Sequence, residues 1–225
     1  MDIYWDSIST AINLIVSLDK KLIEVFFLSF KVTIIALFIS CFIGLPLGTF
    51  LATQRFKGRN LLIGIINSLM SLPPVVVGLF VYINLSRSGP FGWLGILYTP
   101  TAMIIAQIIL ILPIIAGLTT QIIEDLQENY NDLFVSLVTP KVTTIKAYII
   151  DARYSLITVV LAGLAKGISE VGAVIIVGGN IDHLTRVMTT TITMETSKGE
   201  LSLALALGII LLITSITINL ILTYK

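Results

Sequence analysis

The chain has 225 residues, of which 56% are hydrophobic and only 12% are charged, and its mean hydropathy is +1.01. Because soluble domains carry about 25% charged residues, this composition excludes an ordinary soluble domain and predicts an integral membrane protein. The net charge of +1 argues against a nucleic-acid-binding surface. One cysteine and one histidine exclude a disulfide framework, a cysteine-rich metal site and a histidine-based catalytic cluster.

The first residues predict a helix at the membrane surface. Residues 2–18 alternate polar and apolar side chains at helical spacing, and Trp5 suits the level of the lipid headgroups. The acidic start, Met1–Asp6, lacks the basic region of a secretory signal. We therefore expect residues 1–24 to form an interfacial segment ahead of a membrane domain at residues 25–222.

The membrane domain contains apolar runs that are each long enough to cross a bilayer, which takes about 20 residues. The expected spans are 25–53, 61–85, 101–123, 155–178 and 201–222. The sequence therefore predicts an all-α integral membrane protein with five transmembrane helices.

The distribution of basic residues predicts the orientation. The short loop Arg55–Arg59 contains three basic residues and no acidic one, so we expect it in the cytoplasm. The odd number of spans then places the N-terminus outside, and both the 124–153 loop and Lys225 inside. Lys141, Lys146 and Arg153 in the large loop agree with this orientation. The basic residues that fall outside or at the outer boundary are Lys20, Lys21, Lys31, Arg87, Arg186 and Lys198.

The second span contains Pro73 and Pro74, which predict a kink or a break in its helix. A break within the membrane is tolerated where it is buried in protein or lines a cavity. The alternative is a kink that only fits neighbouring helices. Gly78, shortly after the prolines, favours close helix packing.

The fourth span carries Lys166 and Glu170, which are four residues apart and are expected to share a helix face and pair. Small residues around them, among them Gly163 and Gly167, permit close approach of another helix. Charges at this depth normally face a bundle interior or an aqueous path. Two interpretations therefore remain open, a salt bridge that locks the packing and a direct role in gating or transport.

Two segments outside the spans have a predicted structure. The charged, amphipathic stretch Glu124–Arg153 cannot stay in lipid, because its charges and backbone groups would lack partners there. We expect it to emerge as a helical loop that docks a partner. The threonine-rich stretch Ile181–Glu200 suggests a short helix against the outer surface, with His183 an exposed loop residue.

The chain contains no phosphate-binding loop, nucleophile elbow or acidic cluster with metal-ligand spacing. We therefore expect no catalytic residue, no metal and no cofactor, and no nucleotide hydrolysis by this chain alone. Five spans make a thin pore wall, so we expect a path formed between two copies.

Several motifs resemble the membrane subunit of ABC importers for oxyanions, of the molybdate/tungstate type. They are Leu72–Gly78, the loop Asp132–Asp151, Ser169–Gly172 and Gly179–Ile181. The resemblance covers residues 24–222. The stretches Arg87–Pro90, Tyr98–Thr101 and Gly179–His183 look more like the tungstate branch than the molybdate branch.

This resemblance implies a type I importer (MetI-like) permease fold with a cytoplasmic coupling helix, in the plasma (inner) membrane. Two copies would form the tungstate path, driven by ATP hydrolysis on two copies of a separate subunit. An extracytoplasmic oxyanion-binding protein would deliver the anion and choose it. Alternatives are a permease for molybdate or a related oxyanion, and an ATP-independent ion channel or secondary transporter that uses Lys166 and Glu170 as a relay.

The family's coupling loop carries a Glu-Ala-Ala…Gly…Ile-x-Leu-Pro signature that inserts into the ATP-hydrolysing subunit. Here Asp132–Phe134 match its Glu-Ala-Ala, and Val138 stands at its glycine. Tyr148, Ile150 and Asp151 stand at the Ile, Leu and Pro, so only the acid and the broad apolar character survive. Without the glycine, Thr139–Pro140 can reverse the chain.

The resemblance assigns residues to three roles. Coupling to the ATP-hydrolysing subunit is expected of Asp132, Leu133, Phe134, Ser136, Val138, Thr139 and Pro140. The gate or path is expected near Pro73, Pro74, Gly78, Lys166, Ser169, Glu170 and Gly172. Arg87 and Arg186 are expected to face the binding protein.

Overall fold

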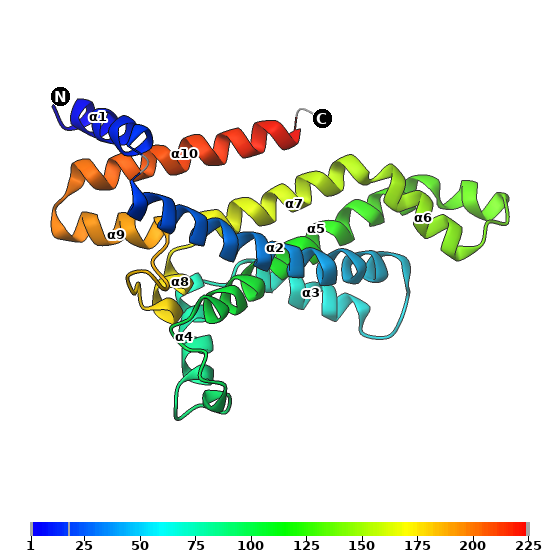
Figure 1. Cartoon of the computed structure of the whole chain (residues 1–225). Helices are drawn as coiled ribbons and strands as arrows, with labels where there is room; N and C mark the ends of the chain where they lie inside the picture. The colour runs from blue at the N-terminus through cyan, green and yellow to red at the C-terminus, as the bar shows by residue number, and fades with distance from the viewer. Residues whose placement is uncertain (1, 18, 224–225) are drawn as a thin grey trace. The chain divides into compact units, whose positions relative to one another are not determined.

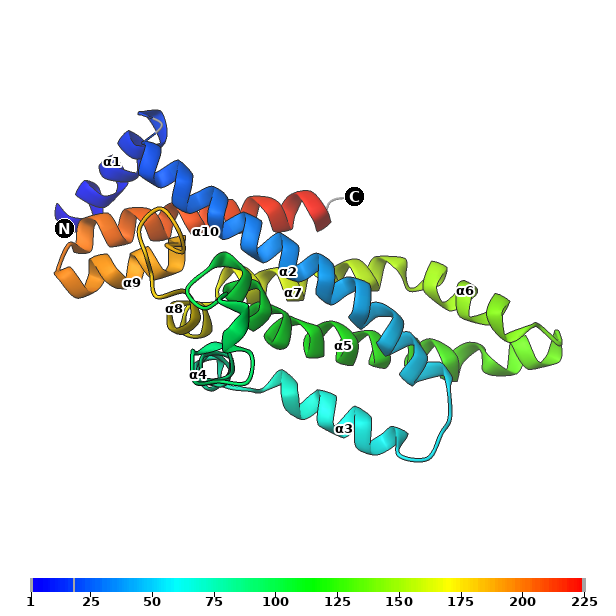
Figure 2. The ribbon, with the colours of Figure 1, turned by 60° about the horizontal axis from the view of Figure 1, so that its bottom comes forward.

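The computed structural model describes residues 2–17 and 19–223, which form helices and turns and contain no strand. The helices are α1 (Asp2–Val16), α2 (Lys20–Thr53), α3 (Arg59–Met70), α4 (Pro74–Leu85), the 3-10 helix η1 (Gly92–Leu94), α5 (Pro100–Ser136), α6 (Lys141–Asp151), α7 (Arg153–Ile168), α8 (Gly172–Gly178), α9 (Met188–Lys198) and α10 (Leu201–Thr223) (Figures 1 and 2). Two predicted positions, the helix end at Leu18 and the inner terminus at Lys225, lie outside the described residues. The predicted all-α class is confirmed.

Within the described part of the chain, three stretches are long and apolar enough to cross a membrane, Lys20–Thr53 in α2, Pro100–Tyr130 in α5 and Leu201–Ile221 in α10. The number rises to five if α3 with α4, and α6 with α7, each count as one bent span. The pair of α6 and α7 differs from the predicted fourth span, which contained α7 and α8. Helices α6 and α7 meet at a bend of 67° after Asp151.

The predicted break in the second span is present. Helix α3 ends at Met70 and α4 begins at Pro74. The fourth span was expected to be one helix over 155–178, and this prediction was wrong. Helix α7 ends at Ile168 and α8 begins at Gly172, so the chain is also broken here. Glycine at positions 167 and 172 weakens the helix at this point, and nearby side chains bond the freed backbone groups.

The described residues form two compact units. The first comprises residues within 1–36, 73–107 and 167–225, and the second comprises 37–72 and 108–166.

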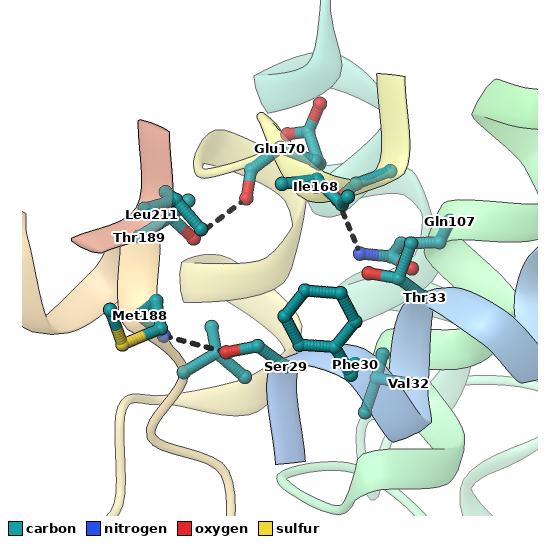
Figure 3. A pocket seen from close by; sticks show the side chains of 12 residues that line it. Ser29, Phe30, Val32, Thr33, Gln107, Ile168, Glu170, Met188, Thr189 and Leu211 are labelled. Atoms are coloured by element: carbon teal, nitrogen blue, oxygen red, sulfur yellow. Dashed lines mark hydrogen bonds between the residues drawn. The ribbon is translucent and has the colours of Figure 1, made fainter. Parts of the chain in front are cut away.

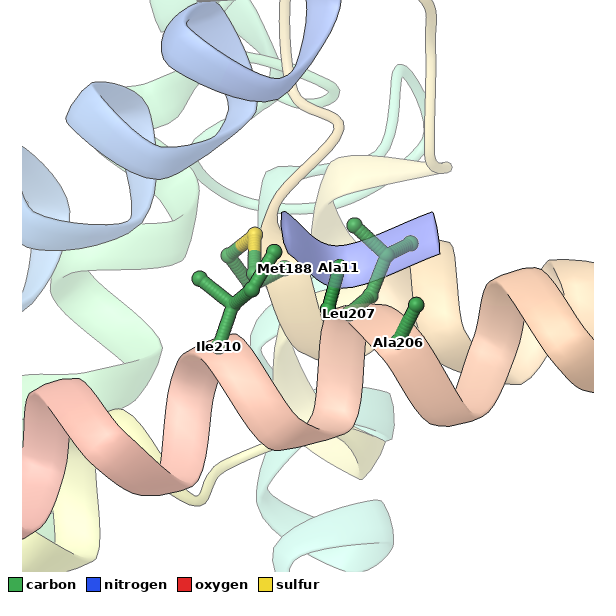
Figure 4. Close-up of a cluster of buried hydrophobic side chains, with 5 residues drawn as sticks. All are labelled: Ala11, Met188, Ala206, Leu207 and Ile210. Carbon is green, nitrogen blue, oxygen red and sulfur yellow. The ribbon is translucent and has the colours of Figure 1, made fainter. Parts of the chain in front are cut away.

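In the first unit, α1 packs along α10 (Figure 4). Buried Ala11 of α1 meets Ala206 and Leu207 of α10, and Met188 and Ile210 complete the cluster. The predicted N-terminal helix therefore exists and has an apolar face against protein. Trp5 is 69% exposed, and its role as a membrane-surface anchor stays a prediction.

In the second unit, two buried clusters join α2 to its neighbours. Leu51 packs with Ile66 of α3 and Ala116 of α5. A second cluster joins Ala52 and Ile123 to Tyr148 of α6. The expected loop at 124–153 is largely helical, because α5 continues to Ser136 and α6 begins at Lys141.

Candidate functional site

Helices α4 and α8 are short, begin at chain breaks and pack against each other in the first unit. At Gly78, a Cβ atom would lie 2.8 Å from the Cα of Ala173. At Gly172, it would lie 2.9 Å from a methyl carbon of Val75. Both predicted glycines therefore lie where the two helices touch, and Gly78 permits a backbone-to-backbone contact.

Pro73 and Pro74 have separate roles in the break before α4. Pro73 is extended (φ −63°, ψ 125°), and Pro74 is the first helical residue, where the missing N–H leaves no donor unpaired. The Pro73 carbonyl accepts hydrogen bonds from Val76 and Val77. The second proline thus starts a new helix instead of kinking an existing one.

Side chains of other elements bond the backbone groups freed at the α7–α8 break (Figure 3). The Gln107 Nε2 donates to the carbonyl of Gly167 at 3.1 Å, and the Thr189 hydroxyl donates to the carbonyl of Glu170 at 2.9 Å. The carboxylate of Glu170, which is 5% exposed, accepts the Ala173 N–H at 3.0 Å. These bonds supply the partners that a broken helix needs in an apolar environment.

Lys166 and Glu170 were expected to share one face of a continuous helix, and this prediction was wrong because α7 ends at Ile168. Lys166 lies half-buried in the last turn of α7, and Ser169 is exposed in the break. Glu170 is buried and supports the start of α8. The gate role of these residues remains a prediction.

The two arginines expected to face a binding protein have different surroundings. Arg87 is exposed in the loop that follows α4. Arg186 is only 21% exposed in its side chain, and its Nη1 bonds Asp182 Oδ1 at 2.7 Å. A second nitrogen, Nη2, donates to the Asn180 carbonyl at 3.4 Å. Arg186 therefore holds its own loop together, whereas Arg87 is available to a partner.

The expected coupling segment is a helical hairpin in the second unit, made by the end of α5, the turn 137–140 and α6. The rings of Phe134 and Tyr148 meet edge to face at 5.4 Å across it. The Thr139 N–H donates to the Phe134 carbonyl, and the Ser136 hydroxyl donates to the Leu133 carbonyl. Pro140 then precedes α6, and its carbonyl accepts the N–H groups of Thr143 and Thr144.

Val138, which stands at the family's glycine position, has φ of +50°. This left-handed conformation is uncommon for any residue with a Cβ and is strained for a β-branched one. The chain thus keeps the turn for which glycine is suited. Thr139 and Pro140 follow Val138 in the same turn, so they take part in the reversal as well.

The turn of this hairpin carries an apolar surface that we call the apolar tip. Its members, each at least half exposed, are Leu133, Leu137, Val138 and Val142. Beside it, between α5 and α6, lies a groove of about 440 Å³ whose lining includes Tyr130, Leu133 and Ile150. Exposed apolar patches of this kind mark contact sites for other molecules.

Asp132 lines a different, polar cavity of about 770 Å³ in the second unit. Arg55 and Arg59 share this cavity with Asp132 and with acidic residues of α5. Arg59 forms an ion pair with Glu124, and its Nε donates to the Leu51 carbonyl at 2.6 Å. The acid of the expected signature therefore lies near the basic loop Arg55–Arg59.

Sequence reasoning missed three residues that build these features. Gln107 and Thr189 bond the α7–α8 break, and Arg59 pairs with a residue 65 positions away. The available signal was a glutamine inside an apolar run, since a buried amide requires partners. Among the described residues, no three of histidine, cysteine, aspartate and glutamate gather as metal ligands.

Comparison with known proteins finds relatives along nearly the whole chain. Residues 44–224 match the family described as binding-protein-dependent transport system inner membrane component. The chain is 40% identical over 219 residues to the tungstate uptake system permease protein TupB of Peptoclostridium acidaminophilum, covering 97% of this chain and 96% of the relative. Identity to the tungstate uptake system permease protein TupB of Campylobacter jejuni is 36% over 171 residues, covering 76% of this chain and 71% of the relative. Identity to the molybdenum transport system permease protein ModB of Azotobacter vinelandii is 25% over 158 residues, covering 67% of this chain and 70% of the relative.

These matches confirm the predicted membrane permease subunit, which is not itself an enzyme. A permease of this kind works with an ATP-binding subunit and a substrate-binding protein. The long apolar helices of this chain and its family match both indicate a multi-pass membrane protein. The chain belongs to the binding-protein-dependent transport system inner membrane components, the permease subunits of ABC importers.

Proposed function

We propose that this chain is the permease of a tungstate importer. Two copies form the path, and ATP hydrolysis on two copies of a separate subunit drives it. The observation that carries the proposal is the 40% identity to a tungstate permease over 97% of the chain. The 25% identity to a molybdenum permease makes molybdate the second candidate substrate.

The apolar tip is the proposed docking site for the ATP-binding subunit. Leu137 is 65% exposed and Val138 is 86% exposed, on a hairpin that Phe134 and Tyr148 stiffen. Burial of apolar side chains in a cleft of the partner stabilises such a contact. Movement of the ATP-binding subunits would then be transmitted along α5 and α6.

The paired breaks before α4 and α8 are the proposed gate. Gly78 and Gly172 let the two short helices move as a packed pair, while Pro73–Pro74 and Ser169–Glu170 supply the breaks. ATP and the loaded binding protein would each favour one of two states, since a ligand shifts an equilibrium only through its differential affinity. Lys166, beside the second break, is part of this proposal.

The Arg59–Glu124 pair supports the proposed orientation. It brings the basic loop Arg55–Arg59 and the start of the coupling segment to the same end of the second unit. By the positive-inside rule this end faces the cytoplasm. The N-terminus and Arg87 would then lie outside, where Arg87 and the loop that contains Arg186 would face the binding protein.

Uptake of radiolabelled tungstate tests this function. Cells would express the chain with its ATP-binding subunit and binding protein, in competition with unlabelled tungstate, molybdate or sulfate. We expect uptake that requires the ATP-binding subunit and is suppressed most strongly by tungstate. Equal suppression by molybdate would widen the substrate class to oxyanions. Uptake without the ATP-binding subunit would favour a channel or secondary transporter.

A further inference from the structure

A small cavity lies inside the first unit, beside the α7–α8 break (Figure 3). Its volume is about 20 Å³. Its lining comes from α2, the first part of α5, the α7–α8 break, the start of α9 and α10. Its polar members include Ser29, Thr33, Gln107 and Thr189. We call it the Gln107 cavity.

The amide of Gln107 is satisfied at only one of its two ends. The side chain is 4% exposed, and Nε2 donates to the Gly167 carbonyl at 3.1 Å. The other end, Oε1, has no hydrogen-bond partner among the described residues. Rotating the amide by 180° would not help, because Oε1 would then face another acceptor, the Gly167 carbonyl. A buried acceptor without a donor is costly, so Oε1 requires a donor from elsewhere.

The other polar groups of the lining narrow the choice of that donor. The Ser29 hydroxyl donates to the Val25 carbonyl and accepts the Met188 N–H. The Thr189 hydroxyl donates to the Glu170 carbonyl. These two hydroxyl protons are therefore used, and the 3% exposed Thr33 hydroxyl remains as a second polar group for a bound molecule.

The size and chemistry of the cavity fit one water molecule. A buried water needs a cavity of about 10–15 Å³ and two or more polar partners. The Glu170 carboxylate also lines the cavity and accepts the Ala173 N–H. The polar groups we assign to the bound molecule, Gln107 Oε1 and the Thr33 hydroxyl, are both neutral. An amide oxygen and one hydroxyl are too few ligands for a metal cation.

We propose that the Gln107 cavity binds a single water molecule, which donates to Gln107 Oε1 and bonds the Thr33 hydroxyl. The water keeps the amide in the orientation that holds the Gly167 carbonyl. Gln107 is thus a positioning residue for the α7–α8 break, and the water is part of its support. The inference concerns the break alone and holds whatever the transported substrate is.

A high-resolution cryo-electron microscopy map of the assembled transporter in lipid nanodiscs tests the site directly. We expect density within hydrogen-bond distance of Gln107 Oε1 and of the Thr33 hydroxyl oxygen. An empty cavity in a map that shows other buried waters would overturn the proposal.

A double-mutant cycle gives a second test in the same assembly. Gln107→Leu and Thr33→Val each remove one partner of the water. We expect the double variant to lower the melting temperature by clearly less than the sum of the two single decreases, because the first change already releases the water. Thr49→Val on the same helix, whose hydroxyl bonds the Leu45 carbonyl, is the control and should add to Gln107→Leu. Additive decreases for Thr33→Val would contradict a shared water.

Discussion

Gly78 of α4 lies against Ala173 of α8 so closely that a Cβ at position 78 would come 2.8 Å from the Ala173 Cα. The atom it would meet belongs to the backbone of a packed helix and cannot move aside as a flexible side chain could. The first prediction is that Gly78→Ala destabilises the protein by about 1–3 kcal/mol through overpacking. Thermal unfolding of the purified protein measures this, and tungstate uptake should fall with it.

Gly208→Ala in α10 is the matched control. No atom lies within 4 Å of the position its Cβ would take. Replacing glycine by alanine inside a helix then stabilises by about 0.5–1 kcal/mol. If the two variants had the same stability, the close contact between α4 and α8 would be disproved.

At Val138 we expect a change to glycine to increase the stability of the protein. Its φ of +50° strains a β-branched residue, and the left-handed conformation costs about 1–2 kcal/mol for a residue with a Cβ. Part of this gain is offset by the greater freedom of glycine in the unfolded chain. We expect Val138→Gly to raise the stability of the protein by up to about 1 kcal/mol, measured by thermal unfolding.

Leu137→Gly is the comparison for that variant, because the neighbouring Leu137 is not among the residues with positive φ. It should leave stability unchanged or lower it. A Val138→Gly variant that loses as much stability as Leu137→Gly would contradict the left-handed turn.

Neutralising Glu124, which pairs with Arg59, should lower the stability of the protein measurably. The side chains are 18% and 35% exposed, so water screens the pair in part. We expect Glu124→Gln to lower stability by about 1 kcal/mol, and the loss should shrink at high salt. Glu128→Gln, in the same polar cavity, is the control and should change stability less. Equal losses would remove the special role of Glu124.

The apolar tip predicts a loss of docking without a loss of folding. Leu137 is 65% exposed, so a charged residue is tolerated in the isolated chain. In the contact with the ATP-binding subunit it would bury a charge, which is costly without a partner. We expect Leu137→Asp to keep its melting temperature but to lose co-purification of that subunit, and Leu137→Met to retain it. Retention by Leu137→Asp would place the docking site elsewhere.

The sequence indicated some of these features and not others, for physical reasons. Hydropathy identified the long apolar helices. Pro73 and Pro74 predicted a break, because proline lacks a backbone N–H and its ring disrupts a helix locally. The α7–α8 break was missed because it depends on Gln107 and Thr189, which bond the freed carbonyls from other helices. The inference that Lys166 and Glu170 share one helix face failed for the same reason, since i, i+4 geometry requires an unbroken helix. Arg59 and Glu124 are brought together by folding, and their own local sequence does not reveal the pair.

The central claim is that this chain forms an ATP-driven path for tungstate. Proteoliposomes would contain the chain and its ATP-binding subunit, with ATP inside, and loaded binding protein outside. The account predicts that labelled tungstate accumulates inside above its external concentration, and that omission of ATP abolishes this accumulation. Tungstate that enters equally well without ATP, and stops at the external concentration, would contradict it.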